Sequence, residues 1–218
     1  MIADLFAWFA DPAHWTGPSS VPARVAEHLG YSLLALAIAA AIALPAGVAI
    51  GHTGKGRRVV VAVSSALRAL PTLGLLTFLA IVLQVGLRQA LIPAVIVLVV
   101  LAVPPLLAGA YAGVHAVPRD VVVAARANGH STRQLVSQVE VPLALPMIVG
   151  GLRSASLQVL ATTSVAAYLG LGGLGRYLFD ALAVQDYTTM LAGAVLIALL
   201  ALVSDAVLLL FQRLVTPA

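Results

Sequence analysis

Residues 121–153 read VVVAARANGHSTRQLVSQVEVPLALPMIVGGLR, a polar, helix-compatible segment that lies between long apolar runs. A simple connector between two apolar helices needs only a few residues. The segment carries Ala124 and Ala125, then Gly129, and then Pro142 and Pro146. We expect a rigid element at about 118–142 that docks onto a partner protein; an ordinary amphipathic connector is the alternative.

The local sequence predicts two short helices in this segment. Pro118 suits a first helical turn, and Asp120 near that start complements the helix dipole. The pair Asn128–Gly129 breaks the first helix. Ser131 can then cap a second helix, together with Gln138.

The composition places the rest of the chain in a membrane. Of its 218 residues, 61% are hydrophobic and 9% are charged, and its mean hydropathy is +1.07, whereas soluble domains carry roughly 25% charged residues. The net charge of +4 comes from basic residues in short loops without an aromatic-rich basic face, which argues against a nucleic-acid partner. The chain has no cysteine, and its five histidines lack metal-ligand spacing, so we expect no metal site.

Apolar runs long enough to cross a bilayer predict an all-α polytopic membrane protein with five core transmembrane helices. These runs are 28–50, 59–85, 90–114, 143–169 and 190–210. The second contains Arg68 and Pro71, and a break there would give six segments. Residues 1–27 are expected to be an interfacial segment, with Trp8, Phe9 and Trp15 at the level of the lipid headgroups.

Basic residues predict the orientation, because Lys and Arg collect on the cytoplasmic side. Under the five-span arrangement, seven of the twelve basic residues lie on one side. They are Lys55, Arg57, Arg58, Arg119, Arg126, Arg133 and Arg213. We therefore expect the N-terminus outside, and the polar segment and the C-terminus in the cytoplasm.

Charged residues inside the predicted spans are costly and usually paired. We expect Asp205 to pair with Arg153 or with Arg68 near an inner gate; the alternative is that each arginine extends to the headgroups. Polar positions could line a solute path or pack between helices. They are Ser64, Ser65, Thr72, Thr77, Gln158, Thr162, Thr163 and Ser164.

A glycine-rich run, LGLGGLG at 169–175, follows the fifth apolar run and contains Gly170, Gly172, Gly173 and Gly175. No strand is predicted before it, so it does not fit a nucleotide-binding loop. We expect a flexible re-entrant loop, or a docking surface for an external partner.

The spacing in the polar segment resembles the cytoplasmic signature of permease subunits of ATP-binding-cassette importers. That signature is Glu-Ala-Ala, three residues, Gly, nine residues, Ile, one residue and Leu-Pro. The matching positions are Ala124, Ala125, Gly129, Val139, Val141 and Pro142. Val123 occupies the glutamate position, and this is the clear departure. The apolar runs and LGLGGLG are similar to the glycine betaine/choline/proline osmoprotectant subfamily, so the resemblance covers nearly the whole chain.

The resemblance implies the type I importer permease fold over residues 28–213, with 214–218 as a cytoplasmic tail, in a bacterial cytoplasmic membrane. It implies ATPase subunits that bind ATP and magnesium, a second permease subunit and an extracytoplasmic solute-binding protein. This chain itself would carry no cofactor and would not be an enzyme; it has no GxxxxGK[ST] phosphate loop. The residues expected to couple it to the ATPase are Asp120, Val123, Ala124, Ala125, Asn128, Gly129 and Pro142.

The departure at Val123 favours a heterodimer of permeases, or a substitution of the missing glutamate by Asp120 one turn earlier. The expected solute is of the glycine betaine, choline, carnitine or proline type. A methionine or other amino-acid importer is the main alternative. A secondary transporter would show deep acidic relays or an inverted repeat, and a membrane enzyme would show a catalytic cluster; the sequence has neither.

Overall fold

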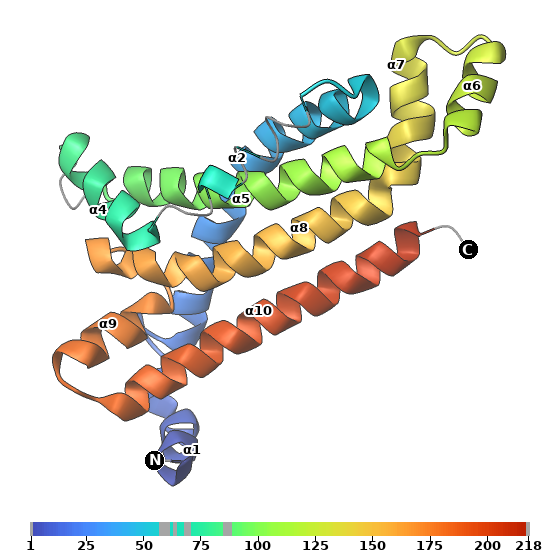
Figure 1. Cartoon of the computed structure of the whole chain (residues 1–218). Coiled ribbons are helices and arrows are strands. Elements are labelled where there is room, and N and C mark those ends of the chain that lie inside the picture. Colours follow the sequence, from blue (N-terminus) through green and yellow to red (C-terminus); the bar gives the residue numbers. More distant parts are fainter. Residues whose placement is uncertain (1, 57–61, 63–64, 68–70, 85–88, 217–218) are drawn as a thin grey trace. The chain divides into compact units, whose positions relative to one another are not determined.

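The computed structural model describes residues 2–56, 62, 65–67, 71–84 and 89–216. Every regular element in these ranges is helical (Figure 1). The elements are α1 (Ile2–Ala10), η1 (Pro12–His14), α2 (Val21–Thr53), α4 (Thr72–Val82), α5 (Leu91–His115), α6 (Arg119–Ala127), α7 (Thr132–Leu135), η3 (Val136–Glu140), α8 (Val141–Thr163), η4 (Ser164–Leu169), α9 (Gly175–Ala183) and α10 (Tyr187–Val215).

Four helical stretches in the described ranges are long and apolar enough to cross a membrane. They are Val21–Thr53, Leu91–His115, Thr132–Leu169 and Tyr187–Val215. These stretches correspond to the predicted runs 28–50, 90–114, 143–169 and 190–210, which leaves the run 59–85. That remaining run lies partly outside the described residues. Its described end gives α4, whose 11 residues begin after Pro71 and span about 16 Å, half of a hydrocarbon core.

The chain packs as two compact units. The first contains Met1–Leu36, Leu70–Val99 and Ser156–Ser204, and the second contains Ala37–Ala69, Val100–Ala155 and Asp205–Ala218. The helices α2, α5, α8 and α10 each contribute residues to both units.

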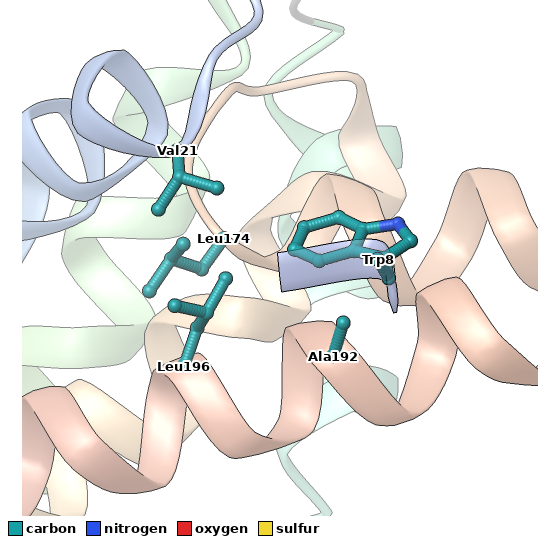
Figure 2. Packing of buried hydrophobic residues seen from close by; sticks show 5 residues of the cluster. All are labelled: Trp8, Val21, Leu174, Ala192 and Leu196. Atoms are coloured by element: carbon teal, nitrogen blue, oxygen red, sulfur yellow. The ribbon is translucent and has the colours of Figure 1, made fainter. Parts of the chain in front are cut away.

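The first unit has a core around Trp8, which packs with Val21, Leu174, Ala192 and Leu196 (Figure 2). The indole Nε1 of Trp8 donates to Thr189 Oγ1 at 3.1 Å. Trp8 is only 7% exposed, so the prediction that this side chain lies among the headgroups is wrong: α1 packs it against apolar residues of α2 and α10. Trp15 is 44% exposed, and its place at the headgroups stays a prediction.

The second unit is packed through small residues. A Cβ atom on Gly47 of α2 would lie 2.7 Å from Ala110 Cβ of α5, and one on Gly109 of α5 would lie 2.8 Å from the Cα of Gly151 of α8. Helices that approach this closely need residues without side chains at the contact. Gly47, Gly109 and Gly151 therefore set the spacing of α2, α5 and α8 in this unit.

Candidate functional site

The helices α6 and α7 form a hairpin with a tight turn at Gly129 (Figure 1). The turn is closed by the backbone: His130 N donates to Ala125 O at 3.2 Å, and Gly129 N donates to Arg126 O at 3.0 Å. Gly129 has a φ of +84°, the left-handed conformation that this type of helix end requires. The His130 imidazole Nδ1 also lies 2.9 Å from Ala125 O, to which it donates. The predicted break at Asn128–Gly129 is confirmed.

The second arm of the hairpin begins with a capping box. Ser131 Oγ accepts from Gln134 N, and Gln134 Oε1 accepts from Ser131 N at 2.9 Å. Ser131 is the predicted cap, but the expected partner Gln138 is wrong, because only a side chain three residues after the cap can reach back to its N–H. Both ends of the hairpin turn are thus fixed by local hydrogen bonds.

The predicted coupling residues fall on different faces of the hairpin. Val123 is 65% exposed, and Ala124 and Asp120 are also exposed. Ala125 is 8% exposed and packs inward, so the expectation that both alanines face a partner is wrong for this one. Asn128 and Gly129 lie exposed in the turn, and Pro142 is exposed at the start of α8. Val123 and Ala124 form a short exposed apolar surface on α6, whereas Val121 lies on the opposite side of this helix from Val123.

A buried acidic residue, Glu140, lies at the base of the hairpin and was missed by the sequence analysis. Its Oε2 lies 2.7 Å from Nδ1 of His52, and the two side chains are 6% and 14% exposed. Glu140 ends the π-helical stretch η3, and a π turn changes which face of a helix its residues occupy. The signal in the sequence was a lone carboxylate between Val139 and Val141, beside the matched Pro142.

A hollow of about 360 Å³ adjoins the His52–Glu140 pair. His115, Arg119 and Arg126 contribute to its lining, together with Val123. In the described residues, no ion pair is formed by Arg119 or Arg126. The base of the hairpin therefore presents positive charge beside an apolar surface, a combination that suits a partner with apolar and acidic groups.

Arg153 and Asp205 form an ion pair in the second unit. This is one of the two pairings that the sequence predicted for Asp205. Arg153 Nε donates to Asp205 Oδ1 at 2.9 Å, and Nη2 donates to Oδ2 at 2.8 Å. Arg153 Nη1 also donates to Gln212 Oε1 at 2.8 Å, and Gln212 Nε2 donates to Pro146 O at 2.7 Å. This two-point pairing satisfies both charges inside the membrane. Arg68, the other predicted partner, lies outside the described residues.

The predicted pathway residues do not form one group. Thr72 and Thr162 line the same small hollow. Thr163 is 1% exposed, and its Oγ1 lies 2.9 Å from Ser32 Oγ, so it packs between α2 and α8 and does not line an open path. Three more side chains are placed as follows. Thr77 donates to Leu73 O of its own helix, Ser164 of η4 donates to Ala161 O at the end of α8, and Ser65 is exposed. Gln158 is half-buried. Ser64 lies outside the described residues.

The glycine-rich loop, Leu169–Gly175, packs closely on its surroundings. Gly170 ends η4 with a φ of +82°, and Gly173 has a φ of +91°. A Cβ on Gly172 would overlap the carboxylate of Glu27, and one on Gly175 would overlap Ser164 O. This packing does not fit the predicted flexible loop. Backbone conformation favours glycine at Gly170 and Gly173, and lack of space requires it at Gly172 and Gly175.

The helix after the loop is tied to the chain before α2. Tyr177 of α9 donates its hydroxyl to Ser19 O at 3.0 Å. Burial raises the pKa of Tyr177, against a smaller opposing effect of the Arg24 charge. The hydroxyl therefore stays a donor at neutral pH, and this bond persists.

Comparison with known proteins covers most of the chain. Residues 28–217 match the family described as binding-protein-dependent transport system inner membrane component. The glycine betaine/carnitine/choline transport system permease protein OpuCB of Bacillus subtilis (strain 168) is 32% identical, over 89% of this chain and 88% of that protein. The choline transport system permease protein OpuBB of the same organism is 32% identical, over 88% of this chain and 87% of that protein.

A solved structure shares the architecture. The inward-facing MetNI methionine ABC transporter matches with a TM-score of 0.76 and 24% identity, over 89% of this chain and 95% of that one. At this level of identity the match shows a common fold and no more.

Proposed function

Because the chain belongs to the family of binding-protein-dependent transport system inner membrane components, we propose that it is the permease subunit of an ATP-driven importer for a compatible solute of the glycine betaine, choline, carnitine or proline type. The observation that carries this proposal is the 32% identity, over 89% of the chain, to a permease named for glycine betaine, carnitine and choline. The likeness to the methionine transporter, at 24% identity, supports only the fold.

In this proposal the α6–α7 hairpin is the contact with the ATPase subunit. Support comes from its stiffness, which the local hydrogen bonds at Gly129 and Ser131 provide. A rigid hairpin can transmit a displacement of the ATPase, whereas a flexible loop would absorb it. Val123, exposed on α6, would contact an apolar part of the ATPase, since it cannot form a charged bond.

The remaining assignments complete the assembly. Residues 1–27 lie outside, 28–213 form the transmembrane domain, and 214–218 form a cytoplasmic tail. ATP and magnesium are bound by the ATPase subunits, so this chain supplies no catalytic group. A second, different permease subunit completes the pair and supplies the charged ATPase contact that Val123 lacks; Asp120, exposed one turn earlier, is the substitute in a homodimer.

The test of the solute is uptake by the whole complex. The permease is purified with its native partners, every subunit is identified, and the complex is reconstituted in vesicles with ATP inside the compartment that the ATPase faces. Uptake of labelled glycine betaine, choline, carnitine, proline and methionine is then measured, with ATP-free vesicles as the control. We expect ATP-dependent uptake of a betaine-type solute. Uptake of methionine alone would overturn the proposal.

The test of the hairpin uses one charge at two positions. Val123→Arg places a cation on the exposed face of α6, and we expect the purified permease to retain about tenfold less ATPase subunit. Ser137→Arg adds the same charge at an exposed position of η3 outside this face, and should retain the subunit. Equal retention in both variants would exclude the face of Val123 as the contact.

A further inference from the structure

A single carboxylate, that of Glu27, joins the start of α2 to the glycine-rich loop. Glu27 Oε2 accepts a hydrogen bond from Gly173 N at 2.7 Å and another from Arg24 Nη1 at 2.9 Å. The Arg24 and Glu27 side chains are 18% and 38% exposed. Bonds from a peptide N–H and a guanidinium to one ionised carboxylate are stronger than neutral ones. The loop therefore depends on a residue far away in the sequence.

The loop is shaped to admit this carboxylate. A Cβ on Gly172 would overlap Glu27 Oε2, and a Cβ on Gly173 would lie 3.3 Å from His28 Nδ1. Two neighbouring residues of α2, Glu27 and His28, thus occupy the space that side chains on the loop would need. The absence of side chains at Gly172 and Gly173 is what allows the carboxylate to reach the backbone of the loop.

The same turn of α2 is fixed to α8. The His28 imidazole is fully buried, and its Nε2 lies 2.8 Å from Leu160 O, to which it donates. One turn later Ser32 Oγ lies 2.9 Å from Thr163 Oγ1. Because Glu27 is adjacent to His28 on this anchored turn, the contact between α2 and α8 fixes the position of Glu27. Through Glu27, the same contact fixes the position of the loop. All of these residues belong to the first unit.

We infer that Glu27 is a positioning residue for import: its carboxylate holds the glycine-rich loop in the conformation onto which the solute-binding protein docks. This inference rests on the proposed function and assigns to Glu27 a role that the match to the family does not supply. It acts through the backbone of Gly173 and does not itself contact the solute. The consequence is that removal of the carboxylate should weaken docking of the binding protein without slowing the ATPase once it is docked.

The first measurement needs no transport. Hydrogen–deuterium exchange of the peptide that contains Gly173 is compared in the purified complex with wild-type chain, Glu27→Ala and Glu27→Gln. Loss of the acceptor should speed exchange of the Gly173 amide about tenfold in Glu27→Ala, while Glu27→Gln, which keeps an acceptor oxygen, should stay close to wild type. Unchanged exchange in Glu27→Ala would overturn the inference, whatever the complex transports.

The second measurement separates positioning from a general structural role. ATPase activity is titrated with the native binding protein saturated with glycine betaine. In Glu27→Ala we expect the half-saturating concentration to rise about tenfold, with the same maximal rate, and Glu27→Gln should largely restore it. The matched control is Asp180→Ala, which removes an exposed carboxylate from an ion pair with Arg176 on α9. A lower maximal rate with unchanged half-saturation would overturn the inference.

A double variant tests the geometry directly. Gly172→Ala should raise the half-saturating concentration in the wild-type background, because the new Cβ displaces the Glu27 carboxylate. In the Glu27→Ala background the same substitution should add nothing, since the group it displaces is gone. Additive effects would overturn the inference. If the wild-type complex shows no stimulation by glycine betaine, the proposed solute is wrong, and the exchange measurement still decides the role of Glu27 in holding the loop.

Discussion

The α6–α7 hairpin and the glycine-rich loop both turn at a glycine of positive φ, +84° at Gly129 and +91° at Gly173, yet they are stabilised in different ways. The hairpin turn is closed by bonds between residues at most five apart in the sequence. A Cβ on Gly129 would meet nothing within 4 Å. The loop is held by Glu27, 146 residues away from Gly173. The hairpin is specified by its own sequence, and the loop is specified by the rest of the first unit.

The largest effect should come from adding one methyl group to the loop. Gly175→Ala places its Cβ against Ser164 O, a backbone atom that can move only if the chain around it shifts. We expect a loss of about 3 kcal/mol in the free energy of unfolding, measured by thermal unfolding in detergent. An unchanged unfolding temperature would contradict the close packing of this loop.

A smaller effect is expected from breaking the long-range pair of the second unit. Asp205→Asn leaves the Arg153 charge unpaired and should lower the free energy of unfolding, by less than for a fully buried pair, since the two side chains are 25% and 23% exposed. The measurement is unfolding in detergent together with uptake. Arg153→Lys keeps the charge but loses the two-point geometry, and should cost less. Full stability and uptake in Asp205→Asn would remove the pair from both roles.

At the hairpin the same glycine-to-alanine change should be milder. Gly129→Ala meets no neighbour, so its cost is the left-handed backbone alone, about 1 kcal/mol. Gly129→Asn should cost still less, because asparagine tolerates this conformation. The measurement is again thermal unfolding. A cost for Gly129→Ala that equals the cost for Gly175→Ala would erase the distinction between the two turns.

The smallest effect concerns a local cap that lies outside the membrane. Asp186 Oδ2 accepts from Thr189 Oγ1 at 2.6 Å, and Oδ1 accepts from Thr189 N at 3.1 Å. The bond from the Thr189 side chain, and then the backbone bond, hold the pKa of Asp186 below its usual value. A lowered pKa in the folded state means stabilisation above the unfolded pKa, near 3.9, that is lost as the pH falls through the folded value.

This stabilisation should be less than about 1 kcal/mol, because an exposed helix cap contributes little more. The measurement is thermal unfolding of wild type and Asp186→Asn between pH 5 and pH 3, in steps below about one pH unit. The two curves should converge as the pH falls. A difference that grows toward acid would show that the carboxylate does not stabilise the start of α10.

The sequence predicted the features that depend on periodicity and on local hydrogen bonding. The all-α membrane fold and the importer family are confirmed, as is the break at Gly129, whose Asn-Gly pair signals a turn by itself. Glu140 and Glu27 were missed because their partners, His52 and Gly173, are 88 and 146 residues away. Trp8 was placed wrongly for the same reason, because its packing partners are distant in the sequence. The local sequence around an aromatic residue near a predicted membrane surface is the same whether the ring packs against lipid or against protein.

The contact between Gly109 and Gly151 has a mechanical consequence. Where two helices meet through glycines, no interdigitated side chains must change rotamer when one helix slides along the other. The attraction between the backbones remains, since the surfaces stay in contact throughout the displacement. The pairing of α5 with α8 in the second unit is therefore suited to shear: it resists separation strongly and opposes a small axial slip only weakly.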